Sequence, residues 1–117
     1  MRKEIIDAIR KTRGGTSFVE LENIPGSVGE KALFAAENLV IWLGLSEKFV
    51  DSFNGLFRDG MIDIKPTSTL VYMIDGKALS IPLAKRIKPY KNLRWLPVVI
   101  NLSKKCQDSA ESQGPSL

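Results

Sequence analysis

The most apolar part of the chain lies near its middle, and it limits the possible folds more than any other feature. Residues 30–43 read EKALFAAENLVIWL, and only Glu37 and Asn38 interrupt the second half of this segment. The pattern predicts a helix over 30–43 that is apolar on almost all of its faces. Such a helix has to be buried at the centre of the fold or covered by a partner. A homodimer is one way to cover it.

The length of the chain, 117 residues, is enough for one compact domain and too small for two ordinary domains. The one cysteine, Cys106, cannot form a disulfide within the chain, which favours a reducing compartment. The first residues are charged and do not resemble an export signal. The longest apolar run, 39–45, is far shorter than the ~20 residues that cross a bilayer. We therefore expect a soluble cytoplasmic protein that contacts no membrane.

Positive and negative side chains are segregated along the chain, whose formal net charge is +4. Residues 1–13 have a net charge of +3 and residues 14–75 one of −5, whereas residues 76–107 hold eight basic and no acidic side chains. A stretch of this kind can bind a polyanion such as nucleic acid. The alternative is a solvated basic loop that balances the acidic middle of the chain.

Local signals predict three further helices. Apolar residues at helical spacing indicate a helix over about 2–12. Ser17 begins a capping box and predicts a short helix over 17–23. Ser46 is placed to cap a helix over 46–58, in which apolar residues again recur at helical spacing.

After residue 60 the apolar period changes from helical to alternating. The runs 62–65, 70–74 and 79–83 predict a three-stranded antiparallel β-meander whose middle strand is apolar on both faces. Asp75 and Gly76 form a strong hairpin signal between its last two strands.

The C-terminal third begins with a basic arm, residues 85–95, which we expect to be irregular. The apolar run 95–102 is expected to pack back onto the body and to complete a single domain over 1–102. Residues 103–117 are polar and small, which predicts a disordered tail.

The segment 38–75 carries a pattern that resembles the winged helix-turn-helix superfamily. A helix, a glycine-containing turn, a capped helix, a second glycine and a strand follow one another, and the matching positions are Gly44, Leu45, Ser46, Val50, Leu56, Asp59, Gly60 and Ile62. The resemblance covers about residues 1–83 and implies an α+β fold of three to four helices followed by the meander. It also implies that the helix 46–58 enters the major groove of DNA, while the wing, 65–69, contacts phosphate or the minor groove.

DNA binding draws its candidate residues from this helix, the wing and the basic arm. The exposed positions of the helix carry three acidic and two basic side chains, a poor surface for phosphate, so a purely structural helix is the alternative. Tyr90 and Trp95 lie among the basic residues and could stack on bases, although Trp95 also begins an apolar run and is expected in the core. The candidate DNA-binding residues are Lys48, Ser52, Asn54, Arg58, Lys65, Thr67, Ser68, Lys85, Arg86, Lys88, Lys91 and Arg94.

Enzymatic activity is not expected. The chain contains no histidine, which excludes a Ser-His-Asp triad, a Cys-His pair and a zinc site with imidazole ligands. The segment 26–31 lacks the spacing of a phosphate-binding loop. Two acidic pairs, Glu20 with Glu22 and Asp59 with Asp63, have no basic or nucleophilic partner in view. We expect no catalytic residue, cofactor or metal.

Two functional hypotheses remain. The first is a DNA-binding winged-helix protein, such as a transcriptional regulator. The second is a non-catalytic winged-helix module that binds another protein and no DNA. The family resemblance favours the first hypothesis.

Overall fold

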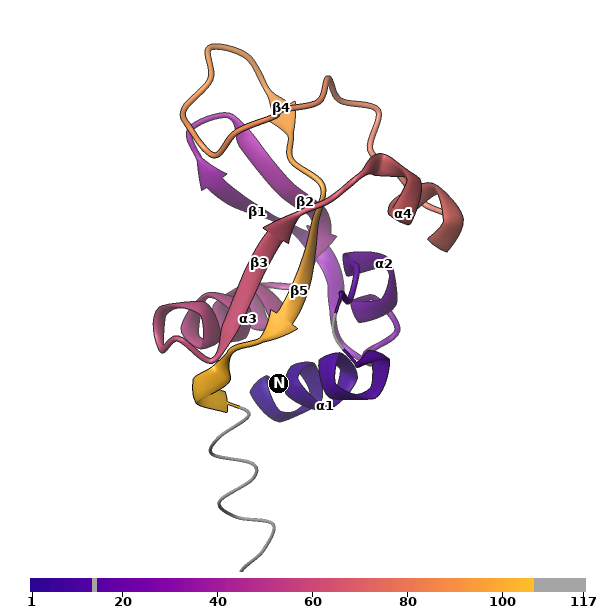
Figure 1. The fold of residues 1–117 in the computed structure, drawn as a ribbon, viewed down its shortest axis with the longest axis vertical. Coiled ribbons are helices and arrows are strands. Elements are labelled where there is room, and N and C mark those ends of the chain that lie inside the picture. The colour runs from indigo at the N-terminus through magenta and orange to yellow at the C-terminus, as the bar shows by residue number, and fades with distance from the viewer. Residues whose placement is uncertain (14, 107–117) are drawn as a thin grey trace, which may run out of the picture.

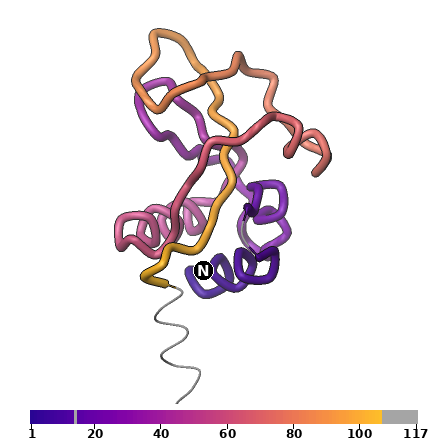
Figure 2. Tube along the Cα trace, in the orientation of Figure 1, coloured from indigo at the N-terminus to yellow at the C-terminus, as the bar shows by residue number. Residues whose placement is uncertain are grey.

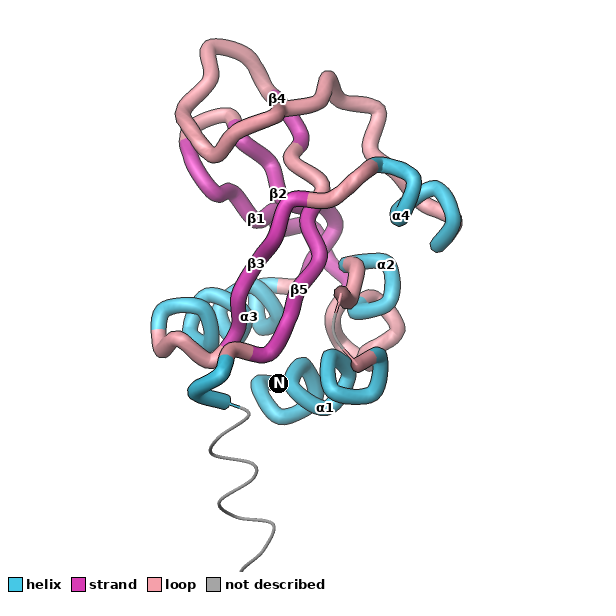
Figure 3. Tube along the Cα trace, in the orientation of Figure 1, coloured by secondary structure: helices cyan, strands magenta, loops and turns pink. Residues whose placement is uncertain are grey.

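The computed structural model describes residues 1–13 and 15–106. In chain order its elements are α1 (Arg2–Thr12), α2 (Phe18–Leu21), β1 (Val28–Ala36), β2 (Leu39–Leu45), α3 (Glu47–Arg58), β3 (Ile62–Pro66), α4 (Thr69–Asp75), β4 (Arg94–Trp95) and β5 (Val98–Leu102) (Figure 1). Helices α1 and α3 lie at one end of the molecule, and the β1–β2 turn and the long loop before β4 lie at the other (Figure 3).

Two small sheets form the centre of the fold. In the first, β2 is the middle strand, antiparallel to β1 and parallel to β4. In the second, β3 and β5 form an antiparallel pair, and Thr16 forms a bridge to Ile100 of β5. Figure 2 shows that these two strands, distant in sequence, run side by side through the middle of the molecule.

The chain is α+β as expected, but the winged helix-turn-helix arrangement is wrong. Of the three predicted meander strands only the first, 62–65, is a strand, and its partner is β5 rather than the next segment along the chain. The second forms α4, and the third, 79–83, forms no strand apart from one bridge between Leu83 and Trp95. The resemblance relied on local order, which does not specify how strands pair.

The predicted apolar helix over 30–43 is also wrong, because this segment forms the hairpin of β1 and β2. Glu37 and Asn38, which interrupt the apolar run, form the turn, and Asn38 adopts a left-handed backbone with φ of 57°. The run Leu39–Trp42 is buried throughout because β2 is covered on both sides by other strands and on both faces by side chains. A central strand and a buried helix both produce a continuous apolar run. Because the chain itself covers this run, it no longer argues for a homodimer.

Helix α4 replaces the predicted central strand. The Ser68 hydroxyl accepts a hydrogen bond from the Leu70 amide at 3.0 Å, and Gly76 ends the helix with φ of 97°. Asp75–Gly76 is therefore a helix end rather than a hairpin turn. Only Tyr72 of this helix is buried.

The locally encoded elements are confirmed. Helices α1, α2 and α3 form where they are predicted, and the side chains of Ser17 and Ser46 cap α2 and α3. The run 95–102 packs back onto the body as β4 and β5, and Trp95 is buried in the core as expected. No helix within the described residues has the length and hydropathy that a membrane span requires.

The predicted tail, 103–117, falls largely outside the described residues. Its first residues pack against the body: Ser103 is buried and donates a hydrogen bond to the Gly60 carbonyl at 2.5 Å. Cys106 is buried as well and carries a free thiol.

Tyr72 connects three parts of the fold at one buried oxygen. Its hydroxyl donates to the Val98 carbonyl at 2.6 Å and accepts from the Phe18 amide at 3.3 Å. Burial is the main cause that raises the pKa of this hydroxyl far above its usual range, so it stays protonated.

We predict that Tyr72→Phe lowers the free energy of unfolding by about 1–3 kcal/mol, because two buried backbone groups lose their partner. Urea denaturation followed by circular dichroism measures the change. Tyr90→Phe is the matched control, with an expected change within about 0.5 kcal/mol, since its hydroxyl bonds the Arg86 backbone at the surface. Equal losses in the two variants would contradict the prediction.

Candidate functional site

The basic loop, residues 85–94, presents the chain's densest positive charge. Its five basic side chains are exposed, and it contains no acidic residue. None of the five forms an ion pair with a carboxylate of the described residues, whose ion pairs lie elsewhere. These five residues are Lys85, Arg86, Lys88, Lys91 and Arg94.

The turn between β1 and β2 holds the basic loop in shape. The Asn38 side-chain amide donates to the carbonyls of Tyr90 and Lys91, both at 3.0 Å. The backbone adds two bonds, from the Tyr90 amide to the Glu37 carbonyl at 3.0 Å and from the Arg94 amide to the Asn38 carbonyl at 2.8 Å. The loop is therefore irregular, as expected, but anchored at its C-terminal half.

Tyr90 arranges the cations of the loop. The Lys88 ammonium lies 5.2 Å and the Arg94 guanidinium 5.5 Å from the centre of its ring. Its hydroxyl donates to the Arg86 carbonyl at 3.1 Å. The half-buried ring is thus already in contact with two cations, and it positions them rather than offering a free face for base stacking.

A shallow hollow of about 310 Å³ opens between these side chains, lined by Leu83, Lys85, Arg86, Lys88, Tyr90 and Arg94. Four of its six lining residues are cationic, so it can accept an anion such as a phosphate group.

The other predicted DNA-binding residues do not join this hollow. Lys48, Ser52, Asn54 and Arg58 lie on α3, at the opposite end of the molecule from most of the loop. The expected wing at 65–69 is not a hairpin tip but the junction between β3 and α4. Lys65 lies on β3, the Thr67 amide bonds the Pro97 carbonyl at 2.9 Å, and Ser68 caps α4.

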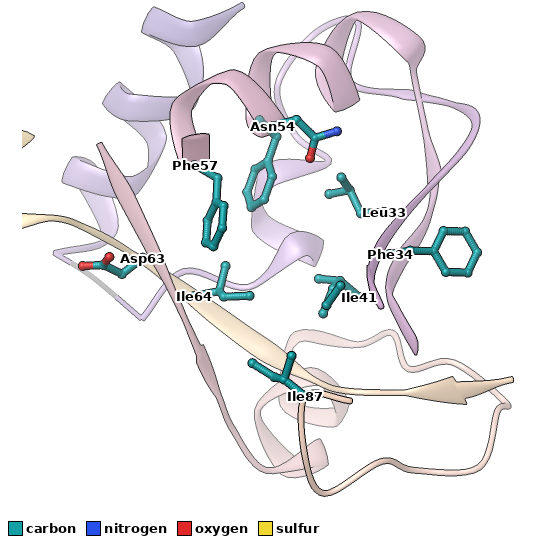
Figure 4. Close-up of a pocket in the computed structure, with 10 residues that line it drawn as sticks. Leu33, Phe34, Ile41, Asn54, Phe57, Asp63, Ile64 and Ile87 are labelled. Atoms are coloured by element: carbon teal, nitrogen blue, oxygen red, sulfur yellow. The ribbon is translucent and has the colours of Figure 1, made fainter. Parts of the chain in front are cut away.

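An apolar groove, which sequence reasoning missed, lies between α3, β1, β3 and the basic loop. It has a volume of about 500 Å³. In Figure 4 Leu33, Ile41, Phe57, Ile64 and Ile87 surround the hollow, while Phe34 and Asp63 point away at its rim. The walls come from separate segments, so no single stretch of sequence signals the groove. The one local hint is Ile87, an apolar residue between Arg86 and Lys88.

A third hollow, between α1 and α2, is lined by acidic residues but offers no metal site. Its carboxylates include Glu4, which pairs with the N-terminal ammonium at 2.9 Å, and Asp7, which lies 3.9 Å from Arg10. Within the described residues no group of three or more acidic or cysteine side chains could hold a metal ion.

Comparisons with known proteins identify no relative. No protein-family model, no curated protein and no solved structure matches the chain.

We predict that Asn38→Gly loosens the basic loop without unfolding the hairpin, because glycine accepts the left-handed backbone but cannot bond the two loop carbonyls. Losing the two side-chain hydrogen bonds should lower the free energy of opening the loop by about 1–2 kcal/mol, which corresponds to roughly tenfold faster hydrogen exchange at the Tyr90 amide. Exchange measured by NMR tests this, with the Ile100 amide, bonded to Thr16, as the internal control. Unchanged exchange at Tyr90 would show that the side-chain bonds do not hold the loop.

For Glu20, in the acidic hollow, the predicted change of stability with pH has the opposite sign to that of most carboxylates. Burial, and then the negative charge of Asp75, raise its pKa above the ordinary value of 4.5. The contribution of Glu20 to the free energy of unfolding is therefore fully present when the pH is below that ordinary value, and it is lost as the pH rises through the pKa that Glu20 has in the folded state.

Glu20→Gln should therefore raise the melting temperature near pH ~7 and leave it unchanged near pH ~4, where the carboxyl is already protonated. Thermal melts at the two pH values measure this. Asp7→Asn, an exposed acid in the same hollow, is the comparison variant. A gain from Glu20→Gln that is equal at both values would contradict the assignment.

Proposed function

We propose that the protein binds DNA through the sugar-phosphate backbone, using the basic loop. The observation that carries the proposal is a set of five exposed cations with no carboxylate partner among the described residues, on a loop that is already anchored. Lys and Arg supply the electrostatic part of DNA affinity by displacing counterions from phosphates. A preformed loop lowers the entropy lost on binding.

The mode of binding differs from that of a winged helix. Helix α3 exposes as many acidic as basic residues, two of each, and none of its residues lines the cationic hollow, so it adds no recognition helix to the phosphate contacts. We accordingly restrict the proposal to backbone contacts, which carry little sequence information, and do not extend it to a transcriptional regulator. The cytoplasm remains the expected compartment because the chain's one cysteine is free.

A non-catalytic protein-interaction role is the second candidate, and the apolar groove supports it.

The test is fluorescence anisotropy of a short labelled DNA duplex of mixed sequence, titrated with the protein at two salt concentrations. With about four phosphate contacts, affinity should fall roughly 100-fold between about 50 and 200 mM salt. The triple variant Lys85→Gln, Lys88→Gln, Lys91→Gln should bind the duplex much more weakly. The slope of the logarithm of its affinity against the logarithm of the salt concentration should correspond to about three fewer phosphate contacts.

The control carries the same three changes at exposed lysines outside the basic loop: Lys3→Gln, Lys11→Gln and Lys104→Gln. It matches the loop variant in net charge and substitution type, so a general loss of positive charge affects both variants equally. The proposal is wrong if the two triple variants bind the duplex alike, or if the unaltered protein leaves its anisotropy flat at low salt.

A further inference from the structure

The apolar groove exposes large side chains that a folded chain ordinarily buries. Phe57 is 49% exposed, Ile87 54% and Phe34 56%. They gather around one hollow from three different elements rather than being scattered singly. Clustered apolar exposure of this kind marks an interaction surface in soluble proteins.

The walls of the groove are built from well-supported elements. Phe57 extends from α3, which also contributes the buried Phe49 and Phe53 to the core, and Phe53 lines the groove as well. Ile64 lies on β3, which pairs with β5 along its whole length. In Figure 4 the side chains of Phe57 and Ile64 lie next to each other on one side of the hollow, and Ile87 approaches from the basic loop. The groove is therefore formed before any partner binds.

No cation lines the apolar groove itself, but at Ile87 the groove adjoins the cationic hollow of the basic loop, which Arg86 and Lys88 line. Ile87 is flanked in the chain by Arg86 and Lys88, both exposed and without a carboxylate partner among the described residues. At the other rim the Asp63 carboxylate points away from the hollow. A group that enters the groove beside Ile87 has to bring apolar surface, and the chain on either side of that group passes the adjoining hollow with its two cations.

We propose that the apolar groove binds a segment of another protein in which a large apolar side chain is flanked by Asp or Glu. The apolar side chain inserts between Phe57, Ile64 and Ile87, and the flanking carboxylates pair with Arg86 and Lys88. The volume of about 500 Å³ suits one or two large side chains rather than an extended domain surface. Aromatic residues at the centre with charge at the rim are the usual anatomy of such sites.

A second copy of this chain matches the groove less well. Outside the groove, α4 carries three large exposed apolar side chains, Leu70, Met73 and Ile74, which are 58–74% exposed. The acid next to them, Asp75, already accepts a hydrogen bond from the Ser17 hydroxyl at 2.5 Å. Helix α4 therefore brings apolar side chains without a free carboxylate for Arg86 and Lys88.

The experiment selects peptides from a random library displayed on phage, using the immobilised full-length protein. We expect an enriched consensus with one Phe, Trp, Leu or Ile beside at least one Asp or Glu. The consensus peptide, synthesised with a fluorophore, should lose at least about tenfold in affinity for Phe57→Ser and for Ile87→Ser. A peptide with its acids changed to amides should bind the unaltered protein more weakly, and should lose no further affinity for Lys88→Gln.

Controls separate the groove from other surfaces and from folding. Met73→Ser removes an apolar side chain of greater exposure from α4 and should leave peptide affinity unchanged. Phe57 is half exposed, so Phe57→Ser should keep a cooperative thermal transition; Ile87→Ser, on the loop, provides a second variant if it does not. Phe57→Ser should also retain DNA binding, whereas Lys91→Gln should lower the affinity for DNA and leave the affinity for the peptide unchanged. These variants therefore show whether the DNA proposal or the peptide proposal fails, independently of the other.

Three results would overturn the proposal. The first is the absence of any enriched consensus, or a consensus without acidic residues. The second is a peptide affinity that Met73→Ser lowers and Phe57→Ser does not. The third is concentration-dependent self-association in sedimentation that Phe57→Ser abolishes, which would identify a second copy as the occupant.

Discussion

The burial of Trp42 on the middle strand of the first sheet supports most of the structure. Its ring lies 6.2 Å from Phe18, 5.1 Å from Tyr72 and 6.0 Å from Trp95, measured between ring centres. These three residues come from α2, α4 and β4, so one side chain contacts three segments that are distant in sequence. The indole N–H donates to the Glu22 carboxylate at 2.8 Å, and Lys77 pairs with the same carboxylate at 3.0 Å. The polar edge of the ring is thus satisfied while its faces remain in the core.

The same hairpin connects the core to the surface that we consider functional. Asn38 closes the turn between β1 and β2 and uses its side chain to fix the basic loop. Ile87 of this loop lines the apolar groove, and the loop ends at Arg94, where β4 pairs with β2. The cations and the groove are therefore positioned by the pairing that buries Trp42, which explains how an irregular loop can present charge in a defined arrangement.

The basic loop and the apolar groove meet at Arg86, Ile87 and Lys88 but make different chemical demands. Phosphate binding needs the cations alone, and the groove adds nothing to it. An acidic segment with an apolar side chain uses both features at once. The two proposed occupants therefore share their contacts with Arg86 and Lys88.

Helices α1, α2 and α3 and the strand β3 could be predicted from the sequence because their signals are local. The hydroxyls of Ser17 and Ser46 cap amides three residues away, and apolar residues recur within a single helix face. The charge of the basic loop was equally visible, since it depends only on composition. Two of the errors, at 30–43 and 70–74, concern apolar runs that fit a strand or a helix equally well when their neighbours are unknown, and the third predicted strand, 79–83, finds no partner beyond one bridge at Leu83.

The partners of these runs come from distant parts of the chain. Residues 39–45 are a strand because β1 and β4 flank them, and 69–75 are a helix because Tyr72 reaches Val98 and Phe18. The groove needs Leu33, Phe57, Ile64 and Ile87 from four segments, none of which marks a site alone. Local hydrogen bonds and periodicity therefore sufficed for the caps, the helices and the charge. Strand pairing and the groove depend on which apolar faces cover one another, and that free energy belongs to contacts between segments rather than to any one segment.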